Sequence, residues 1–208
     1  MKRKIILAST SPNRSGLLEQ LGLEVDIVPS AYEEDMSLRM NPKKMVMKFA
    51  EGKADDVANN TPIKGIVIGV DTLAVCRGEK LGKPGTRENA VRMLKKISGR
   101  TIKVYSGVCI IDVDVNEKKK IVDYEISKVR MKKLSDEEIE AYVNTGEPLG
   151  KAGAFAIQGM GAVFVEKIKG CYSNVVGLPL HNIYKNLLKK GTNILEYGKW
   201  KEENETSE

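Results

Sequence analysis

The sequence predicts an α/β fold, because short apolar runs rich in β-branched residues alternate with segments whose apolar residues recur at helical spacing. A second observation is that no internal repeat and no long linker divides the 208 residues. We therefore expect a single domain over residues 1–200, followed by an acidic flexible tail over 201–208.

The first predicted strand covers residues 4–8 and leads directly into a turn rich in hydroxyl groups. A helix follows, since Ser11 suits the N-cap, Pro12 suits the first helical position and Gly22 suits the end. The start of a helix directs backbone N–H groups at one point, which is typical of a phosphate site, and Arg14 is placed to clamp the same anion. The alternative is that the serines only cap the helix and Arg14 is solvated.

A second strand is expected over residues 24–28, followed by an acidic loop around Glu33-Glu34. Asn41-Pro42 then begins a long helix with a continuous apolar stripe. Lys53 lies on that stripe. It either extends its ammonium out to solvent or reaches a buried anion.

The apolar run over residues 65–75 predicts a buried strand with Asp71 near its end. A buried carboxylate needs a cation, a metal ion or several donors as partners. Asp71 is therefore either a satisfied structural side chain or a catalytic or metal-binding carboxylate at the carboxyl end of the strand. An inward Lys53 would provide the partner that Asp71 needs.

The later elements follow from equally local signals. A loop rich in Gly and Pro exposes Lys83, and a helix runs from Thr86 to Gly99. Strands over 102–113 and 121–131, joined by a turn at 116–119, form a hairpin. A capping box at Ser135 begins a short helix, and a last helix runs through 180–187 with His181 on its surface. Between these helices, a glycine-rich segment carries Gln158, whose amide either reads a base edge or is satisfied within its loop.

Composition narrows the class of protein. No apolar run is long enough to span a membrane, and the N-terminus has too few apolar residues for a signal peptide, so we expect a cytoplasmic protein without membrane contact. The three cysteines lack any CxxC spacing and predict neither disulfides nor a zinc site. A net charge of +6 suits an anionic ligand. Scattered basic residues and an aromatic content of 5% argue against nucleic-acid binding.

Ordered motifs extend from Ile6 to about Leu188: LASTSPNRSGLLEQLG, the pair Glu33-Glu34, AEGKA, GVDTLAV, LGKP, GEPLGKAGAFAIQG and GCYSNVVGLPL. Together they resemble the Maf family of nucleoside triphosphate pyrophosphatases. The resemblance implies an elongated, two-lobed mixed sheet with flanking helices, similar to the inosine triphosphate pyrophosphatase fold, with a cleft between the lobes. It also implies a homodimer that uses Mg²⁺ or Mn²⁺ to split a nucleoside triphosphate into the monophosphate and pyrophosphate.

The resemblance further implies that Asp71 is the catalytic carboxylate, acting as general base or holding a metal ion with the help of Glu34. The residues implied to hold the triphosphate are Ser9, Arg14, Lys53 and Lys83, with both lysines counted as catalytic. This assignment agrees with the chemistry, since phosphoryl transfer depends mainly on positioning and on neutralising charge.

Thr72 and Gln158 fall where the family reads its base, and the form EPLxKAGAxxIQG is similar to the branch that acts on dTTP and UTP. One residue departs from the family pattern, because Asn13 stands where SPRR has an arginine, at a position associated with substrate choice. An amide still bonds a base or a phosphate, but it brings no charge. The preferred base, the use of modified pyrimidines and the physiological metal therefore stay open.

Two functions of other classes also stay open. One is a non-enzymatic regulator of septum formation, the role from which the family took its name. The other is nucleic-acid binding through the +6 surface.

Overall fold

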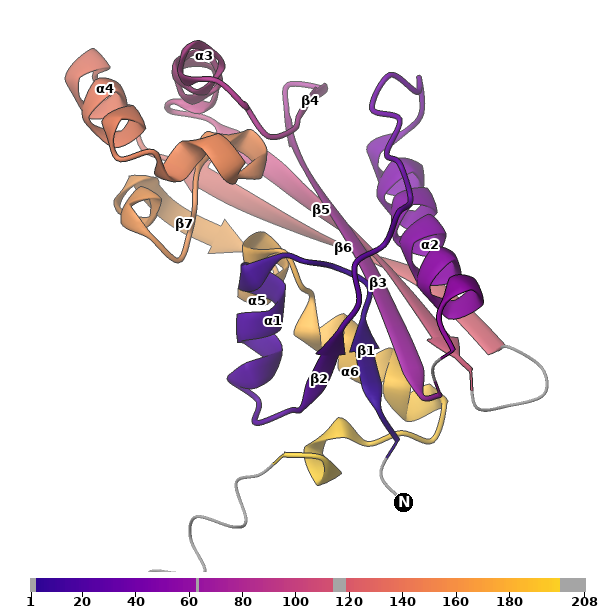
Figure 1. The fold of residues 1–208 in the computed structure, drawn as a ribbon. Helices are drawn as coiled ribbons and strands as arrows, with labels where there is room; N and C mark the ends of the chain where they lie inside the picture. The colour runs from indigo at the N-terminus through magenta and orange to yellow at the C-terminus, as the bar shows by residue number, and fades with distance from the viewer. Residues whose placement is uncertain (1–2, 63, 114–118, 199–208) are drawn as a thin grey trace, which may run out of the picture.

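The computed structural model describes residues 3–62, 64–113 and 119–198. Over these residues, a seven-stranded mixed sheet runs in the order β2-β1-β3-β5-β6-β7, with β4 paired to β3 (Figure 1). The strands are β1 (Ile5–Leu7), β2 (Val25–Ile27), β3 (Ile66–Cys76), β4 (Glu79–Leu81), β5 (Thr101–Asp112), β6 (Lys119–Met131) and β7 (Val165–Lys169). The predicted α/β fold with a mixed sheet and flanking helices is confirmed.

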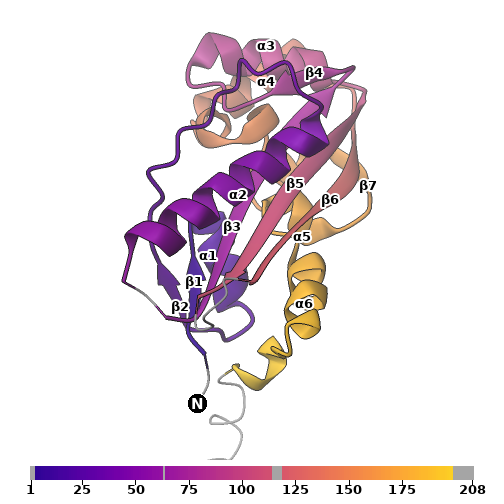
Figure 2. The same ribbon diagram turned by 90° about the vertical axis from the view of Figure 1, so that its right-hand side faces the viewer.

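The helices divide unequally between the two faces of the sheet. They are α1 (Pro12–Glu19), α2 (Pro42–Asn60), α3 (Arg87–Ile97), α4 (Asp136–Asn144), α5 (Tyr172–Val176) and α6 (Leu180–Lys189), with short 3₁₀ turns η1 (Glu147–Gly150), η2 (Ala152–Ala154), η3 (Met160–Phe164) and η4 (Ile194–Glu196). Helix α2 packs against one face, while α1 and α6 pack against the opposite face at one end of the sheet and α3 and α4 at the other end (Figures 1 and 2). The molecule thus has separate hydrophobic cores towards the two ends of one sheet.

Three predicted helix starts are confirmed by their capping bonds. Asn41 Oδ1 accepts from the backbone N–H of Lys43 at 2.9 Å, and Thr86 Oγ1 accepts from that of Asn89 at 3.3 Å. Ser135 forms the full capping box that its sequence predicts. Ser11 occupies the N-cap of α1 as expected, but its side chain makes no capping bond.

Strand β3 has the same length as the predicted run over 65–75 but lies one residue later, and Asp71 is at its middle. The expectation that Asp71 lies near the carboxyl end of its strand is therefore wrong. The reason is a tight turn in which Arg77 and Gly78 both have positive φ, at 50° and 81°. This turn folds the chain back as β4, a strand that the sequence reasoning missed, and β3 keeps its extended conformation up to Cys76. The predicted turn at 116–119 falls mostly outside the described residues, and the tail over 201–208 lies wholly outside them.

One edge of β3 is left without a strand partner at its centre. Strand β1 pairs with β3 only at residues 66–68, and β4 pairs with it only at 74–76. On the other edge, β5 pairs with β3 continuously from residue 66 to residue 75. Within the described chain, residues 69–73 therefore form a gap in the sheet edge, and Asp71 is at its middle.

Helix α2 lies unusually close to the sheet because two glycines face it. A Cβ built on Gly69 would lie 2.3 Å from the carbonyl oxygen of Ala50, and one built on Gly107 would lie 2.1 Å from that of Val46. Both distances are far below van der Waals contact, and both neighbours are backbone atoms. The two glycines thus set the depth at which α2 presents Lys53.

We expect Gly69→Ala to lower the free energy of unfolding by about 3 kcal/mol, because the new methyl group must push α2 away from β3. Urea denaturation followed by circular dichroism measures the change. Gly16→Ala is the matched control, since a Cβ at Gly16 in α1 meets nothing within 4 Å. That variant should gain about 0.5–1 kcal/mol. Equal stabilities for the two variants would contradict close packing of α2.

The basic residues are not all scattered, which corrects the expectation from composition. Strand register places Lys103, Lys128 and Lys169 side by side across β5, β6 and β7, and Arg130 beside Lys167 in the neighbouring row. All five side chains are exposed. Strand β7 is at the end of the strand order and so forms one edge of the sheet.

Among the described residues, no helix combines the length and the apolar content needed to cross a membrane.

Candidate active site

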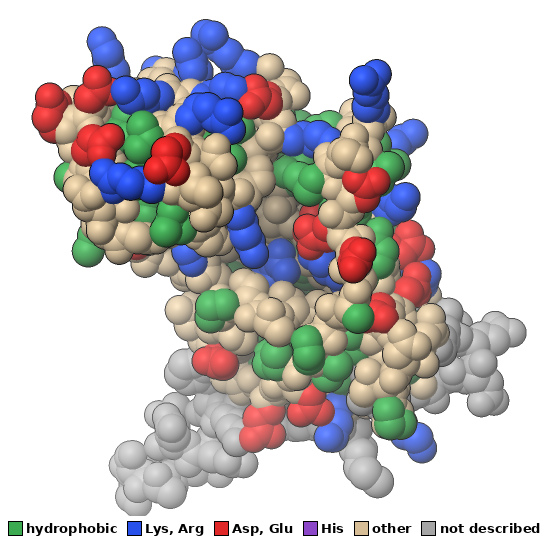
Figure 3. Space-filling model, turned by 45° about the horizontal axis from the view of Figure 1, so that its top comes forward, with side chains coloured by type: hydrophobic (Ala, Val, Ile, Leu, Met, Phe, Trp, Pro, Cys, Tyr) green, Lys and Arg blue, Asp and Glu red, His purple; other side chains and the backbone are tan. Residues whose placement is uncertain are grey.

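A cavity of about 640 Å³ opens at the gap in the edge of β3. Figure 3 shows the molecule hollowed here, with Lys and Arg side chains on the walls. The walls of this cavity are formed by the loop after β1, the end of α5, and the segments around Gly82 and Gly150. Every residue that the sequence reasoning assigned to the site lines this cavity: Ser9, Asn13, Arg14, Glu34, Lys53, Asp71, Thr72, Lys83 and Gln158.

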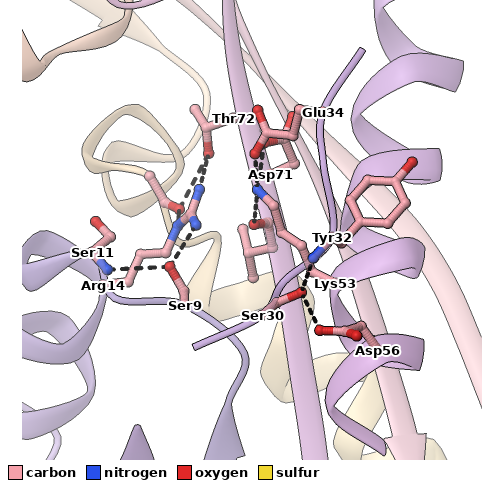
Figure 4. Close-up of polar contacts among 12 residues, drawn as sticks. Ser9, Ser11, Arg14, Ser30, Tyr32, Glu34, Lys53, Asp56, Asp71 and Thr72 are labelled. Carbon is pink, nitrogen blue, oxygen red and sulfur yellow. Dashed lines mark hydrogen bonds and ion pairs between the residues drawn. The ribbon is translucent and has the colours of Figure 1, made fainter. Parts of the chain in front are cut away.

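At the centre of the cavity, one lysine joins two carboxylates (Figure 4). Asp71 is only 7% exposed, and Lys53 Nζ donates to its Oδ1 at 2.9 Å. The same ammonium pairs with Glu34. The sequence left two alternatives open for Lys53. The structure shows that it reaches a buried anion and does not extend its ammonium to solvent.

The surroundings of the two carboxylates push their pKa values in opposite directions. Burial raises the pKa of Asp71, and the charge of Glu34 raises it further, although Lys53 opposes both effects. For Glu34, burial is again the largest single effect and raises the pKa, but the hydrogen bond and charge of Lys53 and the charge of Arg14 outweigh it, so the pKa is lowered. Asp71 is thus the carboxylate better suited to accept a proton, while Glu34 stays ionised.

Arg14 ties together three separate segments beside this cluster. Its Nη1 donates to Ser9 Oγ at 2.9 Å, its Nη2 to Thr72 Oγ1 at 3.3 Å and its Nε to the carbonyl oxygen of Gly177 at 2.9 Å. Thr72 Oγ1 is also 2.9 Å from Ser106 Oγ, on the face of β3 opposite to Asp71. Within the described part of the protein, three of the five donors of Arg14 are thus engaged, which leaves two for an anion.

The cavity rim carries further cationic and amide groups. Lys151 Nζ donates to Asn13 Oδ1 at 3.2 Å, so a cation stands beside the position where Asn13 replaces an arginine. Lys83 and Gln158 are exposed on the cavity wall. Within the described ranges, Lys53 is the lysine bonded to Asp71, and Lys83 makes no ion pair with it. Lys53 thus bonds to Asp71 directly, whereas Lys83 shares the cavity with Asp71 without bonding to it.

A pair of carboxylates can hold a divalent cation where phosphate oxygens and water supply the remaining ligands. The described part of the chain has no cluster of three or more His, Cys, Asp or Glu side chains that would hold a metal by itself. Mg²⁺ is usually bound through one or two carboxylates together with phosphate oxygens and water. Asp71 and Glu34 already share one cation, the ammonium of Lys53, so they provide the donors that such a site needs.

The family model described as "Maf-like protein" matches residues 4–190. This chain belongs to the Maf family. A dTTP/UTP pyrophosphatase of Methanosarcina barkeri is 48% identical over 197 residues, covering 94% of this chain and 98% of the relative. A protein of the same name from Ruminiclostridium cellulolyticum is 45% identical over 195 residues, covering 93% of this chain and 100% of the relative.

Among solved structures, a nucleoside-triphosphatase described as a dITP/XTP pyrophosphatase from Mycobacterium abscessus has 15% sequence identity and a TM-score of 0.38. The match covers 63% of this Maf chain and 75% of that protein.

Sequence reasoning missed several residues of this Maf protein that shape the cavity. Lys151 entered only as the lysine of the form EPLxKAGAxxIQG and was given no role in the site. Asp56 and Glu147 were given no role, because their partners are 25 and 13 residues away in the chain, at Ala31 and Met160. Glu147 accepts from the backbone N–H groups of Met160 and Gly161 and thereby anchors the segment after Gln158.

Proposed function

We propose that this protein hydrolyses nucleoside triphosphates, dTTP and UTP before others, to the monophosphate and pyrophosphate. The observation that carries the proposal is a buried carboxylate, Asp71, which Lys53 joins to the exposed carboxylate of Glu34 in a cavity whose walls carry three further cations. Phosphoryl chemistry needs such a combination of a proton acceptor and compensating charge. The names of the Maf relatives support the choice of substrate.

In this proposal, Asp71 accepts the proton of the attacking water while the anhydride bond between the α- and β-phosphates breaks and pyrophosphate leaves. Its raised pKa favours that role, since a base works best when its pKa approaches the working pH. Lys53 holds the carboxylate in place and balances its charge. Lys83, together with the two free donors of Arg14, faces the phosphate groups.

We propose Mg²⁺ or Mn²⁺ as cofactor, held by Asp71 and Glu34. The ion supplies charge neutralisation to the phosphate oxygens. The donor set supports this, because both carboxylates line the cavity and share one cationic partner.

For base selection we propose Gln158, whose exposed amide on the cavity wall both donates and accepts. Thr72 is the weaker candidate, since its hydroxyl group already meets Arg14 and Ser106. Lys151 supplies at Asn13 the positive charge that this position lacks. Modified pyrimidine triphosphates stay within the proposed substrate class.

We further propose that the protein works as a homodimer in the cytoplasm, where its nucleotide substrates are found. Light scattering on the purified protein tests the dimer.

The function is tested with purified protein and Mg²⁺ on a panel of ordinary and modified nucleoside triphosphates. We expect dTTP and UTP to give the highest kcat/KM, with monophosphate and pyrophosphate as products identified by ³¹P nuclear magnetic resonance. Removal of the metal with EDTA should abolish turnover. Release of orthophosphate, or no product from any triphosphate with Mg²⁺ or Mn²⁺, would refute the proposal.

A further inference from the structure

The wall of the cavity that carries Glu34 is a segment without helix or strand, residues 29–38, which we call the Glu34 loop. It connects β2 to α2. The position of Glu34 therefore depends on the contacts that fix this loop to the rest of the protein. Two such anchors flank Glu34 in the sequence.

The first anchor is Asp56 on α2 (Figure 4). Its Oδ2 accepts from Ser30 Oγ at 2.9 Å and from the backbone N–H of Ala31 at 2.7 Å. Ser30 Oγ in turn accepts from the backbone N–H of Tyr32 at 3.0 Å. One carboxylate thus fixes three consecutive residues just before Glu34.

The ring of Tyr32 makes a further contact between the Glu34 loop and α2. It lies against Gly52, where a Cβ would come within 2.2 Å of the ring, and its centroid is 6.1 Å from that of Phe49. Gly52 immediately precedes Lys53 in α2. The loop therefore rests directly on the turn of helix that presents Lys53.

The second anchor is Lys80 on β4. Its Nζ donates to the carbonyl oxygens of Met36 at 3.0 Å and Leu38 at 2.9 Å. Glu34 is thus fixed on both sides, by α2 before it and by β4 after it.

We propose that Asp56 is a positioning residue, which holds the Glu34 loop on α2 so that Glu34 meets Lys53 and Asp71. It does not line the cavity and acts only through Glu34. The inference rests on the proposed function, because it assigns Asp56 to the site where Glu34 would hold a divalent ion.

The carboxylate of Asp56 is suited to this task. Its hydrogen bond from the backbone of Ala31, followed by those from Ser30 and Asn60, lowers its pKa. It therefore remains a charged acceptor across the neutral range, and charged acceptors form the stronger hydrogen bonds. The same helix carries Lys53 three residues earlier, so one rigid element places both the lysine and the loop.

Asp56→Ala is expected to lower kcat/KM about 10-fold, the lower end of the range found when a direct partner of a metal ligand is removed, because Asp56 acts on Glu34 only through the loop. Asp56→Asn, which keeps one carbonyl acceptor for Ser30 or Ala31, should recover part of the loss. The matched control is Asp55→Ala. Asp55 is the neighbouring carboxylate on α2 and pairs with Lys120 of β6 at 2.7 Å, away from the Glu34 loop. This control should keep wild-type activity.

A double-mutant cycle with Glu34→Gln separates positioning from a general structural effect. If Asp56 acts through Glu34, adding Asp56→Ala to Glu34→Gln should cause no further loss. Losses that multiply would overturn the proposal. Thermal melting identifies any variant that fails to fold, and in that case Asp56→Asn is used for the same cycle.

A binding measurement provides a readout without turnover. Electron paramagnetic resonance of Mn²⁺ with a non-hydrolysable α,β-methylene triphosphate should show about 10-fold weaker Mn²⁺ affinity for Asp56→Ala than for wild type and Asp55→Ala. Equal affinities would refute the positioning role. If the wild-type protein bound Mn²⁺ and this analogue but cleaved no triphosphate, the proposed function would fail while this comparison still decided the role of Asp56.

Discussion

Asp71→Asn is expected to lower kcat for pyrophosphate release by about 10²- to 10⁴-fold, the usual contribution of a general base. The amide is nearly isosteric with the carboxylate and still accepts from Lys53, so the fold should be kept, while the loss of an anionic ligand should also raise the concentration of divalent ion needed for activity. What the variant loses is a group that takes a proton from water in a cavity where burial raises its pKa. Steady-state kinetics with dTTP, coupled to pyrophosphate detection, measures the effect.

A matched control is Asp112→Asn, which neutralises another buried carboxylate of the same sheet. Asp112 is 5% exposed, pairs with Arg3 and does not line the cavity. Its variant should lose stability and keep its kcat. If Asp71→Asn retained wild-type kcat, Asp71 would be a structural carboxylate, the alternative that the sequence had left open.

Lys53→Met is expected to lower the free energy of unfolding by about 3–5 kcal/mol at pH 7, because it leaves buried negative charge without its cation. The side chains of Lys53 and Asp71 are only 12% and 9% exposed, so solvent screens little of this interaction. Lys120→Met is the control. Its partners Glu51 and Asp55 are surface groups, and their loss should cost about 1 kcal/mol or less. Urea denaturation at fixed pH measures both variants.

The stability lost in Lys53→Met should grow as the pH rises. The pKa of Asp71 in the folded protein is already raised, and removing Lys53 removes the main effect that lowers it. The folded variant then holds a proton that the unfolded chain, with a carboxyl pKa of about 4, has released. Stability falls with increasing pH wherever the folded state binds more protons. The loss of the lowered pKa of Glu34 acts in the same direction. A deficit that stays constant from pH 5 to pH 8 would contradict the proposed pairing.

Most helices and strands could be predicted from the sequence, because the interactions that begin and end them join residues close together in the chain. The cap residues Asn41, Thr86 and Ser135 bond to backbone groups two or three residues away, so their identity alone marks where helices begin. Lys53 was identified for a similar reason, since its place on an apolar stripe follows from helical periodicity.

The remaining features depend on contacts between distant segments. The gap at residues 69–73 exists because β1 ends its pairing at one point of β3 and β4 begins at another, and neither limit is written in β3 itself. The anchors Asp56 and Lys80 act on a loop that lies 18 or more residues away from either of them in the chain. Sequence reasoning could place Asp71 in a strand, but it could not show that the strand is open beside it.

The row of lysines across β5, β6 and β7 also affects how the protein behaves at high concentration. Among the described residues, strand β7 has a strand partner on one side only, and such edges invite a second copy to add its own strand. Lys167 and Lys169 would bring like charges together if two β7 edges approached each other. The opposite edge, β2, offers only three residues for pairing. Charge on β7 and the short length of β2 therefore both oppose the end-to-end joining of two sheets.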